Sequence, residues 1–202
     1  MKARPPDRDV GAFEVRATTY EDGWKGRMHG DIAARTAELA VSAGGRPTRV
    51  LDVGCGTGLV LRQVAARLPR AEVLVGIDPA PTMVEVARRT GTDARLRFEC
   101  GVAEHLPFED ASFDLVVSAT SFDHWKDQRA GLAECARVLA PGAPLVLTDL
   151  ISLWLFPATV LGHRDRARTR RRVRPLLREA GFSAARWHRL YALLLTSVVA
   201  TR

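Results

Sequence analysis

Short apolar runs alternate with helical stretches along most of the chain. From residue 49 onward, leucine-rich or β-branched runs are separated by segments whose apolar residues recur every three or four positions. This alternation is typical of βαβ units, which build parallel sheets covered by helices on both faces. The runs that predict strands are Arg49–Val53, Glu72–Ile77, Ala94–Cys100, Phe113–Ser118 and Leu145–Thr148.

Two further strands are predicted after Gly181. Ser183–Leu190 and Ala192–Thr201 lie close enough in sequence to pair as an antiparallel hairpin. The predicted fold class is therefore α/β, with a doubly wound, mostly parallel sheet of seven strands.

Helices are expected between the strands. In Thr57–Leu68, the residues Val60, Leu61 and Val64 form one apolar stripe, and Pro69 ends the segment. The other predicted helices are Asp31–Ala43, Pro81–Arg89, Gln128–Leu139 and Arg168–Ala180. An arm containing aromatic residues, Phe13–Trp24, precedes them and belongs to no predicted strand.

The chain length of 202 residues fits a single structural domain, without internal repeats or linkers. The three cysteines have no C-x-x-C spacing, which argues against a disulfide framework and a cysteine-based zinc site. No metal site is predicted. The charged N-terminus is unlike a secretory signal, and Asp149 and Pro157 interrupt the most apolar segment, 143–161. We therefore expect a cytoplasmic protein without stable membrane insertion.

The charge of the chain is strongly positive, with a formal net charge of +7. Such a balance prompts a search for nucleic-acid binding. Only Lys2, Lys25 and Lys126 are lysines, so arginine dominates, and this bias can reflect coding composition. The densest run, Arg164–Arg178, has helical spacing. A solvated helix face is the favoured interpretation, with an RNA- or membrane-binding patch as the alternative.

A glycine-rich turn is the most informative motif. In VLDVGCGTGLVL, residues 50–61, a buried strand leads through Gly54, Gly56 and Gly58 into a helix. Glycines at such a turn let a ligand approach the main chain, beside the free N–H groups of the helix N-terminus. Leu59 stands where a dinucleotide fingerprint needs its third glycine, and no Gly-Lys-Ser/Thr of a P-loop follows. Asp78, at the tip of the next strand, is placed to accept hydrogen bonds from ribose hydroxyls.

Four motifs in order carry a family resemblance: VLDVGCGTG, GIDPAPTMVEVAR, AEHLPFEDASFDLVVS and ARVLAPGAPLVL. With them the chain, from about Phe13 onward, resembles class I S-adenosylmethionine-dependent methyltransferases. It is most similar to the small-molecule group that includes ubiquinone and menaquinone biosynthesis enzymes. The resemblance implies a Rossmann-like fold and methyl transfer to O, C or N of a small, hydrophobic metabolite, with S-adenosylhomocysteine as product. It also implies that residues 1–45 form an arm and helix over the active site and that residues 46–202 bind the cofactor.

The resemblance also assigns cofactor contacts. The three glycines would lie against the methionine part, Asp52 would position its amino group or the loop, and Asp78 would hold the ribose. The remaining implied cofactor-binding residues are Pro79 and Met83 flanking the adenine, Val102, Ala103 and Glu104 around its pocket, Ser118 after the fourth strand, and Tyr20 in the arm. Gly101-Val102 stands where the family usually has an acidic residue. The backbone there or Glu104 substitutes for it, or the affinity is modest.

Candidate catalytic residues follow the fourth strand, where the crevice of such a sheet opens. The segment 118–125 lacks the Asn/Asp-Pro-Pro-Tyr/Phe motif of planar-amine methylation, and no Pro-Cys nucleophile is present. His124 is the predicted general base, with simple packing or helix capping as the alternative. Asp123 is the second candidate, and an N-cap is its favoured role. His29 and His163 are weaker candidates that we expect to be solvated.

Three questions stay open at this stage. The apolar segment Leu150–Leu161 is either a substrate lid or a subunit contact. The same fold could bind S-adenosylmethionine without methyl transfer, in a binding or pericyclic role, or could methylate RNA. The expected partner is a small-molecule substrate rather than a nucleic acid, and the chain is expected to be a monomer or a homodimer.

Overall fold

Seven strands form one sheet in the computed structural model, which describes residues 8–149, 151, 169–191 and 195–202. The strand order is β3-β2-β1-β4-β5-β7-β6. The pairs within β1 to β5 are parallel, and β7 runs antiparallel to both β5 and β6. The strand bounds are β1 Arg49–Val53, β2 Val73–Asp78, β3 Leu96–Cys100, β4 Leu115–Ala119, β5 Pro144–Asp149, β6 Ala184–Tyr191 and β7 Leu195–Thr201. The predicted α/β class and the antiparallel hairpin are confirmed.

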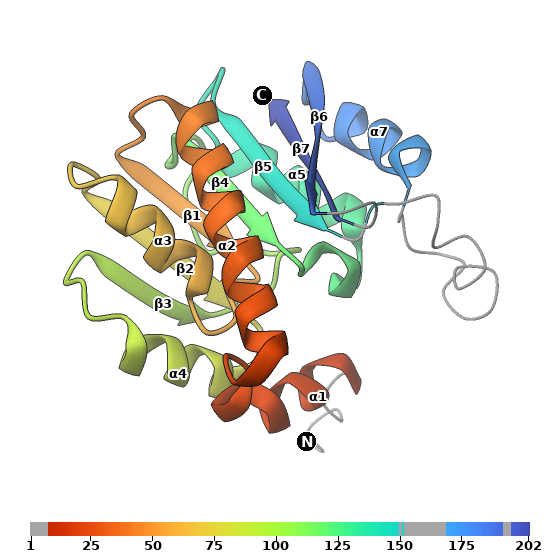
Figure 1. The fold of residues 1–202 in the computed structure, drawn as a ribbon. Helices are drawn as coiled ribbons and strands as arrows, with labels where there is room; N and C mark the ends of the chain where they lie inside the picture. Colours follow the sequence, from red (N-terminus) through yellow and green to blue (C-terminus); the bar gives the residue numbers. More distant parts are fainter. Residues whose placement is uncertain (1–7, 150, 152–168, 192–194) are drawn as a thin grey trace, which may run out of the picture.

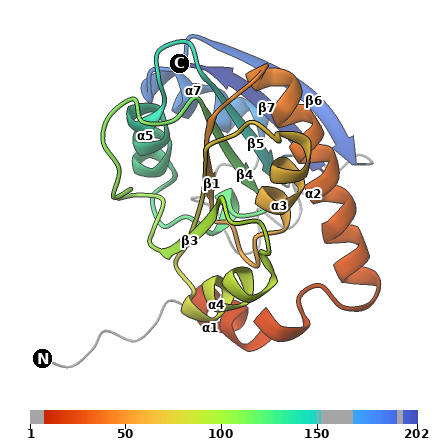
Figure 2. The same cartoon turned by 90° about the vertical axis from the view of Figure 1, so that its left-hand side faces the viewer.

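Helices cover both faces of this sheet, as Figures 1 and 2 show. The helix bounds are α1 Arg8–Arg16, η1 Ala17–Thr19, α2 Gly23–Gly44, α3 Leu59–Arg67, α4 Pro81–Thr90, η2 Phe122–His124, α5 Gln128–Val138 and α7 Arg170–Glu179. Apolar side chains of α2, α3 and α4 pack on one face. Those of α5 and α7 pack on the other. The two hydrophobic clusters are the two halves of one doubly wound core.

The strand order places a crevice beside β1. The chain passes from β1 outward to β2 and β3, and then returns to β4 on the other side of β1. Ligands of open α/β sheets bind outside the carboxyl ends of the strands at such a reversal of strand order. The glycine-rich turn after β1 and the segment after β4 therefore face one another across the site.

The N-terminal region is more helical than its pattern predicts. The helix expected over Asp31–Ala43 begins eight residues earlier, at Gly23, and the arm before it forms α1 and η1. The sequence does not predict a helix here, because the glycines at 23, 26 and 30 have low helix propensity. Gly26 has a tertiary reason, because a Cβ there would lie 1.9 Å from the backbone oxygen of Glu21. The helix start therefore tolerates no side chain at this position.

The arm packs over the carboxyl edge of the sheet. Val10, Phe13 and Tyr20 lie against a small cluster that contains Met83 of α4. Figure 1 shows α1 beside α4, at the end of the molecule where the long helix α2 begins. This arrangement brings aromatic side chains of the arm to the site.

Several expectations fall outside the described residues, namely most of the apolar segment 150–161, His163 and residues 164–168 of the arginine run. Ile151 is described and is buried. Among the described helices, none combines the length and the apolar composition needed to cross a bilayer.

Candidate functional site

The glycine-rich turn adopts a backbone that favours glycine at three positions. Gly54, Gly56 and Gly58 have φ values of +73°, +53° and +82°. A Cβ on Gly54 would lie 2.3 Å from the side chain of Ser121, which follows β4. The turn is fixed to β2, because the N–H groups of Gly54 and Cys55 both donate to the carbonyl of Ile77. The main chain of the glycine-rich turn thus lies against the beginning of the segment that follows β4.

Asp78 joins this turn to the end of β2. Its Oδ2 accepts a hydrogen bond of 2.8 Å from the N–H of Gly56, and its Oδ1 accepts one of 2.9 Å from Ala80. Burial raises the pKa of this carboxyl, and the two backbone hydrogen bonds oppose that shift. A carboxylate oxygen can accept more than one hydrogen bond, so Asp78 retains acceptor capacity toward the cleft.

Two adjoining cavities meet at Gly54, Asp78 and Ser121. Their open space, which is partly continuous with solvent, amounts to about 610 and 650 Å³. Other residues of the first cavity are Phe13, Tyr20, His29, Ile32, Ala33, Asp52, Cys55, Gly56, Thr57, Leu59, Val60, Met83, Ala119 and Thr120. Other residues of the second cavity are Val10, Pro79, Gly101, Val102, Ala103, Glu104, His124, Trp125 and Lys126. A single elongated ligand could therefore extend from one cavity into the other past these three shared residues.

Asp52 gives the first cavity a site for positive charge. Its side chain is 1% exposed, and neither carboxyl oxygen has a hydrogen-bond partner among the described residues. Burial, and secondarily the charge of Asp78, raises its pKa to about 8. Thr57 Oγ1 is likewise buried without a partner among those residues. A buried, unsatisfied carboxyl is costly, and a cationic ligand group in the first cavity would satisfy it.

The residues predicted to bind the cofactor divide between the cavities. Tyr20 and Met83 line the first cavity, together with Asp52, Gly54 and Gly56. Those that line the second cavity are Pro79, Val102, Ala103 and Glu104. Glu104 Oε1 also accepts a hydrogen bond from the N–H of Asp127.

Gly58 and Ser118 line neither of these two cavities. A Cβ on Gly58 would lie 2.7 Å from the ring of Phe98, so this glycine permits close packing of the α3 start on β3. Ser118 is fully buried, and its Oγ lies 2.8 Å from Ser121 Oγ, which donates to the carbonyl of Val53. The structure therefore gives these two residues supporting positions behind the cleft.

The two residues predicted for proton transfer lie in η2. His124 lines the second cavity, and its ring meets the edge of Phe13 at 4.9 Å between centroids. Asp123 is buried and its N–H donates to Asp149 Oδ2. The expectation that Asp123 caps the following helix is wrong. Asp127 caps α5 instead, accepting from the N–H groups of Arg129 and Ala130.

Sequence reasoning undervalued His29 and Thr120. His29 was expected to be solvated, but its ring stacks on Tyr20 at 4.5 Å and borders the first cavity. Thr120 borders the same cavity with a φ of +54°, and its N–H donates to the carbonyl of Thr148. A β-branched residue in this conformation is strained, and such strain gathers at functional sites. The spacing of His29 from Ile32 and Ala33 on one helix face was the available signal.

Comparison with known proteins decides the family. Residues 51–147 match the family model described as a methyltransferase domain. The chain carries a class I S-adenosylmethionine-dependent methyltransferase domain. S-adenosylmethionine is the cofactor of this domain, and its cationic methionine end, ribose and adenine suit the acidic cavity, Asp78 and the second cavity.

Relatives of the methyltransferase domain support this assignment. A demethylmenaquinone methyltransferase of Deinococcus radiodurans is 44% identical over 59% of this chain and 50% of its own length. The chain spans about half the length of the curated relatives it matches first.

Solved structures share the fold of the methyltransferase domain. A complex of the Haloferax volcanii Trm112 methyltransferase activator with a putative methyltransferase gives a TM-score of 0.76, at 22% identity over 94% of this chain and 96% of the other. The [4+2]-cyclase SpnF gives 0.68, at 22% identity over 84% and 80%.

Proposed function

We propose that this chain transfers a methyl group from S-adenosylmethionine to O, C or N of a small, apolar acceptor. The observation that carries the proposal is the pair of cavities bridged by Asp78, one of which holds the unsatisfied carboxyl of Asp52. This arrangement offers separate places for a cation, a ribose and a flat base.

Each part of the cofactor has candidate partners. Asp52 would bind the ammonium group, with Thr57 as a further hydrogen-bonding group beside it. Asp78 would accept hydrogen bonds from the ribose hydroxyls while keeping its bonds to Gly56 and Ala80. The adenine would lie between Pro79 and Ala103 in the second cavity.

S-adenosylmethionine supplies a methyl group on a cationic sulfur atom. The chain's own contribution is to orient the two reactants in line and to exclude water. The arm would exclude water, because Phe13 and Tyr20 form part of the wall of the first cavity. We propose that residues 1–45 act in this way as a cover for the cofactor-binding part, residues 46–202.

Two alternatives predict different products. A protein that binds S-adenosylmethionine without transferring its methyl group would form no S-adenosylhomocysteine, and the fold is shared by a cyclase. An RNA methyltransferase would use the arginines of α7. The methyltransferase names of curated relatives favour a small molecule. We propose a cytoplasmic protein, monomeric or homodimeric, that does not require nucleic acid.

Isothermal titration with S-adenosylmethionine and S-adenosylhomocysteine tests the cofactor site. Asp78→Ala should weaken both ligands about a hundredfold, because hydrogen bonds to a charged group contribute roughly 1.5–3 kcal/mol each. Asp78→Asn keeps the shape and part of the hydrogen bonding, so its loss should be smaller. Wild-type protein that binds neither ligand would contradict the proposal.

Product analysis tests the transfer itself. The protein is incubated with S-adenosylmethionine and a panel of apolar phenols and quinols, and S-adenosylhomocysteine is measured by mass spectrometry. We expect stoichiometric formation of S-adenosylhomocysteine and methylated acceptor. Tight cofactor binding with no product from any acceptor class would favour the non-methylating alternative.

A further inference from the structure

His29 occupies a position that the family motifs do not cover. It lies on α2 and borders the cavity that contains Asp52. Its imidazole stacks on the ring of Tyr20, with 4.5 Å between centroids and 14° between planes. The side chain is half-buried and Nδ1 is screened from solvent. The stack therefore fixes the orientation of an acid–base group beside the cleft.

The charge of the two cavities decides where the chemistry takes place. The first cavity contains the buried carboxyl of Asp52, whereas the second combines apolar residues, among them Pro79, Val102 and Ala103, with one acidic and one basic residue, Glu104 and Lys126. A cationic sulfur is favoured near the carboxyl and a neutral purine between apolar walls. Since Asp78 is shared by the two cavities, the reacting methyl group of a bound cofactor would lie on the first-cavity side of the ribose. An acceptor must reach it from that side.

Only one of the two candidate histidines described at the cleft lies on that side. His124 borders the second cavity, and its ring makes a T-shaped contact with the ring of Phe13. His29 borders the first cavity, among aromatic and apolar side chains suited to a flat acceptor. The other titratable groups bordering the first cavity are Asp52, Asp78, Cys55 and Tyr20.

We propose that His29 is the general base of the reaction and accepts the proton of an acceptor hydroxyl group. This inference rests on the proposed methyltransferase function. The O–H bond breaks, the proton binds to an imidazole nitrogen, and the oxygen keeps the electron pair with which it bonds to the methyl carbon. The bond from that carbon to the cofactor's sulfur would break at the same time, the sulfur keeping its electron pair, so that S-adenosylhomocysteine leaves. The imidazolium then returns its proton to water. His124 would instead pack beside the adenine of the cofactor in the second cavity.

An acceptor-like probe tests this assignment without turnover. 2-Naphthol, an apolar aromatic alcohol, is added to the complex of the protein with S-adenosylhomocysteine, and the naphtholate absorbance is followed against pH. We expect the apparent pKa of bound 2-naphthol to be lower by about one unit or more in the wild type than in His29→Phe, because the imidazole takes up its proton. Phenylalanine preserves the aromatic stack, so the arm stays in place.

Two matched variants complete the experiment. His188→Phe removes a histidine of β6 that borders neither cavity, and it should keep the wild-type 2-naphthol titration. His124→Phe should also keep it, although its cofactor affinity changes. Three results would overturn the assignment. The lowered pKa of bound 2-naphthol could persist in His29→Phe, it could be abolished by His124→Phe alone, or the complex could bind no 2-naphthol. Isothermal titration with S-adenosylhomocysteine separates this failure from a failure of the proposed function, which would appear as wild-type protein that binds no cofactor.

Discussion

The buried carboxyl of Asp52 couples the stability of the fold to pH. Its pKa is raised from 3.8 to about 8 in the folded chain, first by burial and then by the charge of Asp78. Between these values the folded state retains a proton that the unfolded state has lost. Stability contributed by the neutral carboxyl is therefore lost as pH rises through this window.

Asp52→Asn should remove this pH dependence. Its free energy of unfolding should exceed that of the wild type by an amount that grows from about pH 4 and reaches roughly 2 kcal/mol or more above pH 8. The same variant should bind S-adenosylmethionine more weakly, since a cation loses its partner. Urea unfolding at pH 5 and pH 9 measures the first effect. Asp31→Asn, at an exposed carboxyl, is the control and should show less than about 0.5 kcal/mol at either pH.

Gly58 occupies a different position from the one that its motif implies. The motif implies contact with the cofactor, but the structure places the position against Phe98. Gly58→Ala should destabilise the protein by about 1–2 kcal/mol for the positive φ, with a further 1–3 kcal/mol for overlap with the ring.

Gly142→Ala separates these two contributions. Gly142 has a φ of +80°, and a Cβ added there would meet no atom within 4 Å, so only the backbone cost applies. Thermal unfolding followed by circular dichroism compares the two variants. Equal destabilisation would show that the Phe98 contact is without energetic importance.

Residue identity alone does not position side chains that converge from separate elements. The position of Asp78 at the end of the strand beside the glycine turn follows from the sequence, but its hydrogen bonds with Gly56 and Ala80 do not. His124 is the base that the sequence predicts, and His29 is a weaker candidate that the sequence predicts to be solvated. Only the packing of the arm, which places Phe13 against His124 and Tyr20 against His29, assigns them to different cavities.

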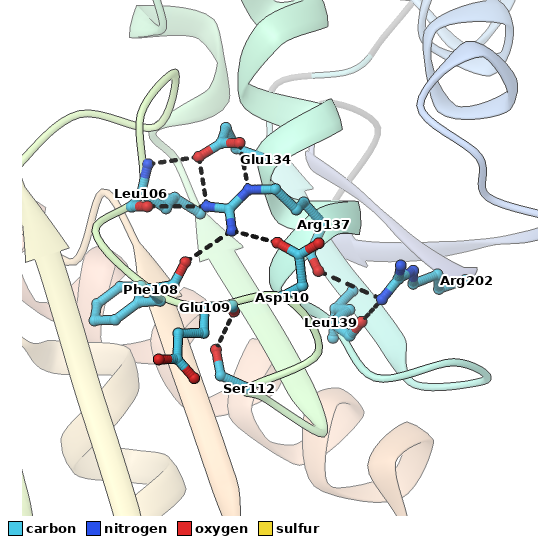
Figure 3. A network of polar contacts seen from close by, with 9 residues as sticks. All are labelled: Leu106, Phe108, Glu109, Asp110, Ser112, Glu134, Arg137, Leu139 and Arg202. Atoms are coloured by element: carbon cyan, nitrogen blue, oxygen red, sulfur yellow. Dashed lines mark hydrogen bonds and ion pairs between the residues drawn. The ribbon is translucent and has the colours of Figure 1, made fainter.

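Among the elements, the loop after β3 depends on one arginine of α5. Arg137 donates to the carbonyls of Leu106 and Phe108 and to the carboxylates of Asp110 and Glu134, as Figure 3 shows. Glu134 also accepts from the N–H of Leu106. The hydrogen bonds from Arg137 lower the pKa of Glu134, and the hydrogen bonds to Glu134 and Asp110 raise the pKa of Arg137 itself. The same loop carries Val102–Glu104 at the wall of the second cavity.

Arg137→Met should loosen this loop. We expect a loss of roughly 1–3 kcal/mol in unfolding free energy, because buried carbonyls lose their donor. The affinity for S-adenosylhomocysteine should fall as well, although Arg137 does not line the cleft. Arg137→Lys keeps the charge but not the planar fork, so it should restore little.

Urea unfolding and isothermal titration measure both effects. Arg67→Met is the matched control, because Arg67 bonds only to the neighbouring Gln63 among the described contacts. If Arg137→Met leaves cofactor affinity unchanged, the loop holds its shape without this network.

Element prediction succeeds where one physical signal dominates. The buried parallel strands β1, β2 and β4 are continuous apolar runs, so their positions follow from the sequence within a few residues. The start of α2 does not, because its glycines contradict helix propensity, and only at Gly26 does a close approach, to Glu21, explain the glycine. The capping role of Asp127 rather than Asp123 depends on a short 3-10 turn that the pattern does not reveal.

At the scale of the whole molecule, the densest run of basic residues within the described part of the chain lies on an outer helix. The exposed arginines of α7 are Arg170, Arg171, Arg172, Arg174 and Arg178. Arg170 lies over the ring of Trp187, at 5.4 Å from its centroid. The helix packs beside α5 (Figure 1), on the face of the sheet opposite α2. These arginines therefore belong to a different surface from the residues of the first cavity.

Binding of single-stranded RNA should accordingly be weak and nearly independent of salt. If all five arginines neutralised phosphates, the logarithm of affinity would fall with that of salt concentration with a slope of about −3.5. We expect a slope shallower than about −1. Fluorescence anisotropy with a labelled uridine oligonucleotide at several salt concentrations measures it. A steep slope, lost when Arg171 and Arg174 are replaced by Gln, would favour the RNA alternative.

The interior position of β7 sets an order of events during biosynthesis. Among the described strands, β6 hydrogen-bonds to β7 alone, and β7 lies between it and β5. As the chain leaves the ribosome, β6 emerges before this partner. Until residues 195–201 follow, the nascent sheet ends at β5 and leaves an open edge that can pair with other chains. Translation must pass this strand before the protein is protected from aggregation.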